Sequence, residues 1–139
     1  MQRPVADGGA ILIAERDPHV RSLQEHFLGL AGFTVEFADD GEAALERARA
    51  APPRLLVTEI LLPKLDGLAL CRRLREDPLT GHVPVVVFSI LAAHQRAEDA
   101  GARAFLRKPF VESTFVAAIR DVIAAQPIGI LEEQWAWQQ

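Results

Sequence analysis

The chain alternates short apolar runs with segments of helical periodicity, five times in succession. In the middle run, Leu55, Leu56 and Val57 follow one another without a polar residue between them, the pattern of a strand buried on both faces of a parallel sheet. Four further strands are predicted at 10–14, 33–38, 84–88 and 105–106. Such alternation with short loops favours a parallel sheet covered by helices on both faces. A closed eight-unit barrel would need nearly twice the length.

The segments between the strands carry helix signals. Asp17 and Pro18 are typical of a helix start, with Asp17 as the N-cap and proline at the first helical position. We predict that this helix buries one apolar stripe toward the core. The stripe consists of Val20, Leu23, Phe27, Leu30 and Ala31. The last helix is expected to bury Phe115, Ile119, Val122 and Ile123.

The length of 139 residues suits one domain with a core of its own. We expect a loose N-terminal segment at 1–9, the domain at 10–125 and a C-terminal tail at 126–139. Pro127 and Gly129 break the helical pattern there, and Trp135 and Trp137 follow. This tail is expected to be frayed or loosely docked, with a partner-binding segment as the alternative.

Composition excludes several classes of protein. The net charge of −4 and the pI near 5.5 argue against binding to nucleic acid or to an anionic membrane surface. Cys71 is the single cysteine, so no intrachain disulfide can form, and we expect it to be a small buried hydrophobe. No signal peptide or membrane span is predicted, and the cytosol fits best. The four histidines lack metal-ligand spacing and are expected at the surface.

Polar residues follow the predicted strands where a ligand site is expected. Ligands of open α/β sheets bind outside the carboxyl ends of the strands. Glu59 follows the buried middle strand, and Ser89 ends the fourth. Lys108 and Pro109 follow the short fifth strand. These side chains are therefore predicted to share one edge of the sheet.

The segment 55–67, which reads L-L-V-T-E-I-L-L-P-K-L-D-G, resembles the phosphoacceptor segment of two-component response-regulator receiver domains. The resemblance covers roughly 11–125 and implies a flavodoxin-like (βα)5 fold, a doubly wound parallel sheet with strand order 2-1-3-4-5. It also implies a role for each matching residue. Glu15 and Arg16 take the place of the family's acidic pair, Glu59 that of the phosphorylated aspartate, and Ser89, Phe105, Lys108 and Pro109 those of the switch and pocket residues.

Arg16 and Glu59 depart from the family pattern. A guanidinium at a ligand position would repel a divalent ion by roughly 8 kcal/mol at an effective dielectric of 20, so we expect Mg²⁺ binding to be lost and no cofactor to be present. The extra methylene of Glu59 should make phosphotransfer weak or absent. We predict that an Arg16–Glu59 or Lys108–Glu59 pair locks the pocket. Alternatively, Glu59 imitates the phosphorylated state, or Asp17 replaces the missing second acid.

These expectations predict an atypical receiver that is not an enzyme and that acts through protein–protein contacts, with a histidine kinase or a downstream effector as partner. A homodimer through the fourth helix, fifth strand and fifth helix is also predicted. That face includes Arg103, Arg107, Glu112, Arg120 and Asp121. The alternatives are a genuine phosphoacceptor with the same fold, and a flavodoxin-like domain that binds a small anion or ligand. The latter is disfavoured because no glycine-rich phosphate loop follows any strand.

Overall fold

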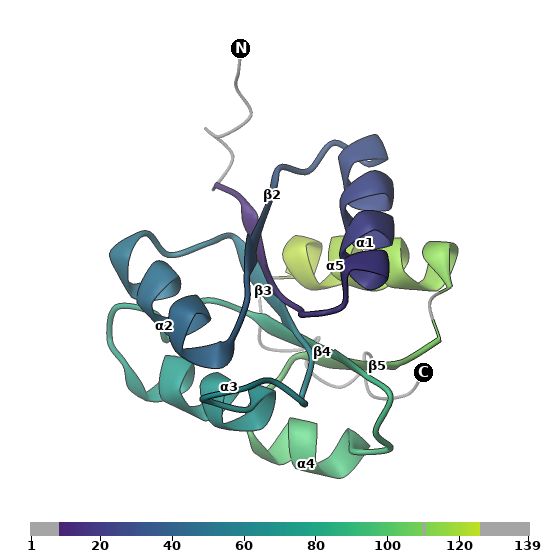
Figure 1. Ribbon diagram of the computed structural model, residues 1–139. Helices are drawn as coiled ribbons and strands as arrows, with labels where there is room; N and C mark the ends of the chain where they lie inside the picture. Colours follow the sequence, from purple (N-terminus) through teal and green to yellow (C-terminus); the bar gives the residue numbers. More distant parts are fainter. Residues whose placement is uncertain (1–8, 110, 126–139) are drawn as a thin grey trace.

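The computed structural model describes residues 9–109 and 111–125, and in these residues five strands alternate with five helices (Figure 1). The strands are β1 (Ile11–Ala14), β2 (Val35–Ala38), β3 (Leu55–Thr58), β4 (Val85–Ser89) and β5 (Ala104–Arg107). The helices are α1 (Pro18–Leu30), α2 (Gly41–Ala50), α3 (Gly67–Glu76), α4 (His94–Asp99) and α5 (Glu112–Ala125). Each predicted strand is present, with ends that differ by at most two residues. Residues 1–8 of the predicted N-terminal segment 1–9, and the predicted tail 126–139 with Trp135 and Trp137, lie outside the described residues.

All five strands pair in parallel, in the order β2-β1-β3-β4-β5, which confirms the predicted topology. In the register, Ile13 of β1 lies between Phe37 of β2 and Val57 of β3. The strands β1, β3 and β4 are buried along their whole length, as their uninterrupted apolar runs predict. Because the strands are parallel, the carboxyl ends of β1, β3 and β4 meet at one edge of the sheet, close to the switch in strand order.

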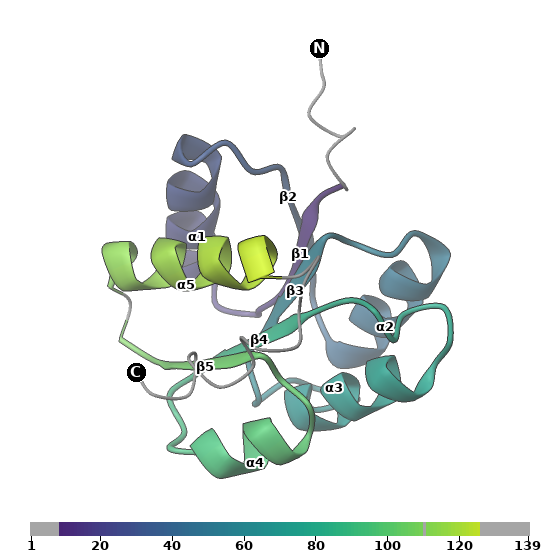
Figure 2. The same ribbon diagram turned by 180° about the vertical axis from the view of Figure 1, so that it is seen from behind.

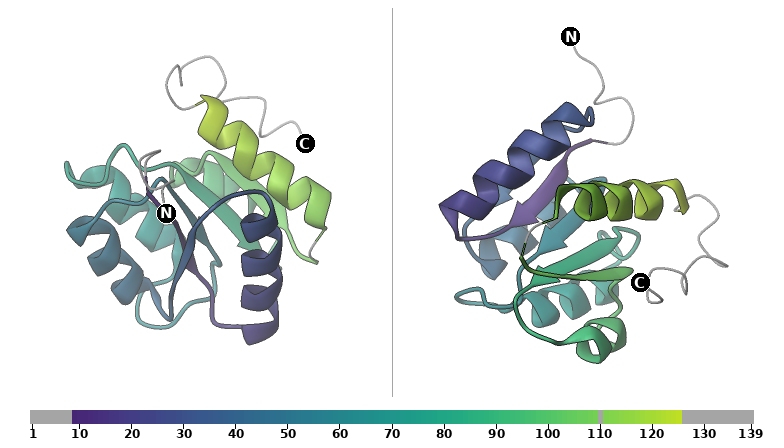
Figure 3. Two further views of the ribbon diagram at one scale, coloured as in Figure 1. Left: turned by 90° about the horizontal axis from the view of Figure 1, so that it is seen from above. Right: turned by 90° about the vertical axis from the view of Figure 1, so that its right-hand side faces the viewer.

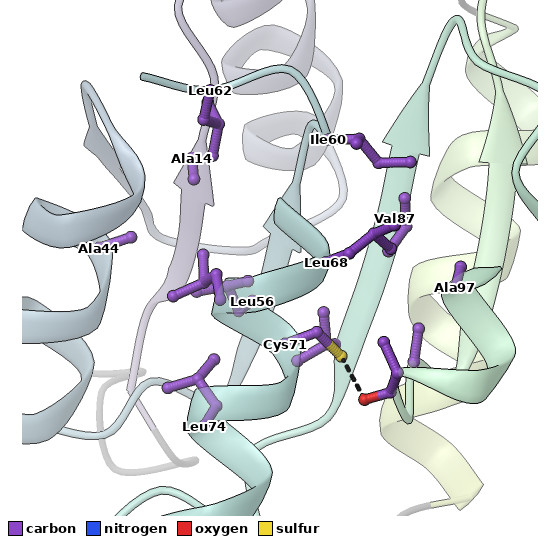
Figure 4. Close-up of a cluster of buried hydrophobic side chains, with 14 of the residues drawn as sticks. Ala14, Ala44, Leu56, Ile60, Leu62, Leu68, Cys71, Leu74, Val87 and Ala97 are labelled. Carbon is purple, nitrogen blue, oxygen red and sulfur yellow. Dashed lines mark hydrogen bonds between the residues drawn. The ribbon is translucent and has the colours of Figure 1, made fainter. Parts of the chain in front are cut away.

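Helices cover both faces of this sheet (Figures 2 and 3). On one face, α2, α3 and α4 pack over a cluster that includes Leu56, Cys71 and Val87. Figure 4 shows this cluster, in which the thiol of Cys71 donates to the carbonyl oxygen of Ala100 at 3.3 Å. The prediction that Cys71 is a buried hydrophobe is confirmed. Burial also raises the pKa of its thiol to about 12, against a smaller opposing effect of Arg75 and Arg72.

On the other face, α1 and α5 pack over a second cluster that includes Ile13, Val57 and Phe88. The helix α5 buries Phe115, Ile119 and Val122 and half-buries Ile123, close to the prediction. Within residues 9–109 and 111–125, no helix has the length and apolarity needed to cross a bilayer.

The start of α1 is as predicted, but its buried stripe is not. Asp17 is the N-cap and accepts from the backbone N–H of His19 at 2.8 Å. The fully buried side chains of α1 are Gln24 and Leu28, whereas Leu23 and Leu30 are 40% and 72% exposed. The prediction was wrong for Leu23 and Leu30, because α1 is rotated so that Gln24 and Leu28 face the sheet, whereas Val20 packs on the second core cluster as predicted.

Candidate functional site

A group of buried polar side chains lies at the carboxyl edge of the sheet. Glu15 follows β1, Glu59 follows β3, Ser89 ends β4, and Lys108 follows β5. Glu15, Glu59 and Ser89 are at most 6% exposed. The structure thus places together four of the residues that the sequence assigned to one site. We call these four residues the Glu59 pocket.

The carboxylate of Glu59 is fully surrounded by hydrogen-bond donors. Its Oε2 atom accepts from the backbone N–H groups of Ile60 at 2.5 Å and Leu61 at 3.0 Å. The hydroxyl of Ser89 donates to the same oxygen. Its Oε1 atom lies 2.9 Å from Nζ of Lys108. The two backbone donors have no signature in the sequence, because any non-proline residue supplies an N–H group.

Lys108 bridges the two buried carboxylates. Its Nζ atom lies 3.1 Å from Oε1 of Glu15 and 2.9 Å from Oε1 of Glu59. The second oxygen of Glu15 accepts from the backbone N–H of Asp17 at 3.1 Å. One ammonium group therefore links the ends of β1, β3 and β5, and the hydroxyl of Ser89 adds the end of β4.

Two opposing effects set the charge states in this pocket. Burial disfavours the charged form of Glu59, but the hydrogen bonds from Ser89, Leu61 and Lys108 outweigh it and hold the pKa of the carboxyl below its ordinary value. Burial likewise disfavours the charged form of Lys108, yet Glu59 and Glu15 raise the pKa of its ammonium. Both groups are therefore charged at neutral pH, as an ion pair requires.

Arg16 does not enter the pocket. Its side chain is exposed, and none of the ion pairs among the described residues involves it. Of the two pairs considered from the sequence, the structure contains Lys108–Glu59 and lacks Arg16–Glu59. The charged site thus consists of two carboxylates and one ammonium, and the prediction of a neutral pocket was wrong. An exposed guanidinium keeps its hydration, and Lys108 already occupies the space between the carboxylates.

Further contacts hold the loops around the pocket. Arg21, which the sequence analysis missed, donates from Nε to the carbonyl oxygen of Glu15 at 2.5 Å and pairs with Asp39 at 2.6 Å. Gly67 packs so closely on the loop after β3 that a Cβ atom there would lie 2.1 Å from the carbonyl oxygen of Glu59. Glycine at the start of α3 is therefore a steric requirement of this site.

Comparisons with known proteins agree with this geometry. The family model described as the response regulator receiver domain matches residues 11–120. The chain belongs to this family. The "DNA-binding dual master transcriptional regulator RpaA" of Synechocystis is 34% identical over 116 residues, which are 81% of this chain and 48% of that protein. The chain spans about half the length, or less, of the curated relatives it matches first.

Solved structures of receiver domains share the fold. A putative response regulator from Chloroflexus aurantiacus is 32% identical and has a TM-score of 0.80, with 84% of this chain and 98% of that chain covered. The receiver domain of sensor histidine kinase PA1611 from Pseudomonas aeruginosa has a TM-score of 0.77, with 84% of this chain and 98% of that chain covered. At 24% identity this likeness shows the fold alone, and that structure holds a magnesium ion in its active site cleft.

The carboxylates of this receiver domain that could hold a divalent cation are engaged by donors of the chain itself. Hard cations such as Mg²⁺ need several free oxygen ligands. Here each carboxylate oxygen of Glu15 and Glu59 already accepts from an N–H, O–H or ammonium donor. Asp17 caps α1 through its Oδ1 atom. In the described part of the chain, no group of three or more His, Cys, Asp or Glu side chains is arranged to hold a metal ion.

The remaining predicted residues of the receiver lie on β5 and directly after it. Phe105 is half-buried, packs against the first core cluster and stacks on the exposed ring of His94, with ring centroids 5.9 Å apart. Pro109 is exposed and follows Lys108 through a cis peptide bond. All four histidines are exposed, which confirms the prediction of surface positions.

Proposed function

We propose that this receiver domain acts without phosphorylation, as a protein-interaction module that the Glu59 pocket holds in one state. The observation that carries the proposal is the set of donors around Glu59. The backbone N–H groups of Ile60 and Leu61, the hydroxyl of Ser89 and the ammonium of Lys108 all point to one carboxylate. An incoming phosphoryl group would have to compete with that carboxylate for the same donors.

The chemistry of phosphoryl transfer supports the same conclusion. Transfer to a carboxylate depends on positioning and on charge neutralisation by a metal ion. Glu59 is one methylene longer than aspartate, and a displacement of about 1 Å can cost about a hundredfold in rate. The carboxylates that would hold Mg²⁺ are paired with Lys108 instead. Both departures lower the rate of transfer.

The proposal is tested by incubating the protein with acetyl phosphate and Mg²⁺ and measuring its intact mass. We expect no gain of a phosphoryl group. A parallel titration with beryllofluoride and Mg²⁺, followed by two-dimensional amide NMR, should leave the resonances of Glu59, Ser89 and Lys108 unchanged. A mass gain or saturable shifts at these residues would instead support a genuine phosphoacceptor.

The matched control is the double variant Glu59→Asp/Arg16→Asp, which restores an aspartate at both departures from the family pattern. Arg16 is exposed, so its replacement should not disturb the core. We expect this variant to show beryllofluoride-dependent shifts that the natural chain lacks. If the variant shows no beryllofluoride-dependent shifts either, the loss of beryllofluoride binding has a cause other than these two residues.

The partners follow from the family. Receiver domains interact with histidine kinases and effectors, and we propose that this one binds such a partner in the cytoplasm without catalysing a reaction of its own. A homodimer through α4, β5 and α5 is part of the proposal. That face carries charges of both signs, as a self-complementary interface needs. They come from Arg103, Arg107, Glu112, Arg120 and Asp121.

The oligomeric state tests the dimer separately. We expect light scattering at increasing protein concentration to report a mass that approaches twice that of the monomer. Arg107→Glu, which reverses one exposed charge on this face, should lower the dimer fraction at low salt. A monomer at every concentration would contradict the dimer but leave the proposal about Glu59 standing.

A further inference from the structure

Arg21 of α1 joins the ends of two strands at the carboxyl edge of the sheet. Its Nε atom donates to the carbonyl oxygen of Glu15 at 2.5 Å, and its Nη2 atom donates to the carbonyl oxygen of Ala38 at 3.1 Å. The same Nη2 atom lies 2.6 Å from the carboxylate of Asp39. The guanidinium also lies over the ring of Phe37, 5.0 Å from its centroid. One side chain therefore holds the residue after β1 against the end of β2.

The regular pairing of β1 stops one residue before Glu15. The last paired residue is Ala14, which lies opposite Ala38 of β2 and Thr58 of β3. The backbone N–H of Glu15 reaches the carbonyl oxygen of Ala38 only at 3.4 Å. A hydrogen bond of that length is weak. The sheet therefore holds the backbone of Glu15 only weakly, and the bond from Arg21 to its carbonyl oxygen is the shorter contact.

The carbonyl group that Arg21 holds belongs to the planar peptide unit between Glu15 and Arg16. A donor that fixes this oxygen restricts the rotation of the chain at Glu15. The two neighbouring side chains differ in burial, since Glu15 is 3% exposed and Arg16 is exposed. The contact with Arg21 therefore acts on the peptide unit at which the chain passes from the pocket to solvent.

The side-chain contacts of Glu15 do not connect its loop to β2. Its Oε1 atom lies 3.1 Å from Nζ of Lys108, which follows β5. Its Oε2 atom accepts from the backbone N–H of Asp17, two residues further along the same loop. The contacts from Arg21 to Glu15, Ala38 and Asp39 make the connection to β2 instead.

Glu59 is held differently. Its Oε2 atom accepts from the backbone N–H groups of Ile60 and Leu61, which follow it in its own loop. Its own backbone N–H donates to the carbonyl oxygen of Ala14 at 3.1 Å, within the regular part of β1. The position of Glu59 is therefore fixed by its own loop and by the sheet, without a contact from Arg21.

We propose that Arg21 is a positioning residue of the Glu59 pocket, which holds Glu15 where Lys108 can bridge both carboxylates. Arg21 acts through the backbone of Glu15 and makes no hydrogen bond to either carboxylate. Without it, Lys108 pairs with Glu59 alone, and the loop after β1 is no longer tied to the loops after β3 and β5. This role rests on the proposed function, because a pocket held in one state needs its loops joined.

Scalar couplings across hydrogen bonds, measured by NMR on the isotope-labelled full chain without metal or phosphoryl compounds, test the proposal. In the natural chain we expect couplings from Nζ of Lys108 to the carboxylate carbons of both Glu15 and Glu59. In Arg21→Ala the coupling to Glu15 should be lost, whereas the coupling to Glu59 should remain. A general loss of stability would not separate the two carboxylates, because they share one ammonium group.

Two further variants make the test selective. Arg21→Lys keeps the positive charge, but one ammonium cannot reproduce the planar fork that reaches both strands. We expect it to fold and to lose the coupling to Glu15, so the test holds even if Arg21→Ala does not fold. Arg47→Ala is the matched control, since Arg47 of α2 pairs with Glu36 at 2.5 Å and donates to the carbonyl oxygen of Phe37 at 3.3 Å, both on β2. Both couplings should persist in this control.

Three results would overturn the inference. They are a coupling to Glu15 that persists in either variant of Arg21, a loss of both couplings together, and an equal loss in Arg47→Ala. Beryllofluoride-dependent shifts in the natural chain would overturn the proposed function instead. The couplings are measured without beryllofluoride, so the two failures are distinguishable.

Discussion

The Glu59 pocket and the inner side of α1 both bury polar groups, but they differ in what surrounds these groups. In the pocket, each carboxylate oxygen of Glu15 and Glu59 has a donor. In α1, the side chain of Gln24 is 1% exposed, and neither its Oε1 nor its Nε2 atom has a hydrogen-bond partner within the described residues. Burial without partners costs free energy that the pocket avoids.

The comparison separates two reasons for keeping a polar residue inside. The pocket needs its charges, because Lys108 and the two glutamates join the loops at the ends of three strands, β1, β3 and β5. Gln24 fixes nothing among the described residues, while Leu23 and Leu30 of the same helix face outward. The buried polar groups therefore stabilise the fold in the Glu59 pocket and destabilise it at Gln24. Apolar substitutions at the two places should change the free energy of unfolding in opposite directions.

The largest effect is expected for Lys108→Met, which keeps most of the unbranched side chain but removes its charge. Glu15 and Glu59 would remain buried without their shared cation, and we expect a loss of about 3 kcal/mol in the free energy of unfolding. Urea denaturation measures it. Lys64→Met is the control, since Lys64 pairs with Asp40 at 3.6 Å from an exposed position and should lose less than about 1 kcal/mol. Equal losses of unfolding free energy in both variants would mean that the buried ion pairs of Lys108 stabilise the fold no more than an exposed pair does.

A smaller effect of opposite sign is expected for Gln24→Met. The substitution removes two buried polar atoms without partners and keeps the shape of the side chain, so we expect a gain of about 1–2 kcal/mol. Gln95→Met is the matched control on α4, where Gln95 donates to Asp99 at 2.9 Å and is exposed. We expect that change to be neutral or slightly destabilising. A loss of stability in Gln24→Met would show that the amide has partners in solution.

The smallest effect should appear in the pH dependence of stability. In the folded state the pKa of Glu59 is below its ordinary value near 4.3. The stabilisation that Glu59 gives the folded state is therefore fully present above the ordinary pKa, and it is lost as the pH falls through the lowered pKa of the folded state. The difference in unfolding free energy between the natural chain and Glu59→Gln should therefore shrink on acidification below about pH 4. A difference that stays constant down to that range would contradict the lowered pKa.

Most of the fold could be predicted because its signals are local. The uninterrupted run of Leu55, Leu56 and Val57 specifies a strand buried on both faces, and Asp17 before Pro18 specifies a helix start. Residues that follow strands in a parallel sheet must meet at one edge, so Glu59, Ser89 and Lys108 could be assigned to one place. The strand order came from the resemblance to receiver domains.

The remaining features depend on packing that no local pattern encodes. The apolar residues of α1 define a stripe, but the neighbouring elements determine which side of the helix faces the sheet. As a result, Gln24 is buried. The prediction that the side chain of Arg16 lies in the pocket was wrong for a related reason. Its sequence position is next to the pocket, yet its side chain turns to solvent while Lys108 reaches in.

The buried thiol of Cys71 has a practical consequence for experiments on this domain. Its pKa of about 12 and its place in the core make it unreactive toward alkylating reagents at neutral pH. The sequence contains no other cysteine. A cysteine introduced at the surface would therefore be labelled selectively in the otherwise natural chain, and pairs of probes on α1 and α5 could report distances without first removing a native thiol.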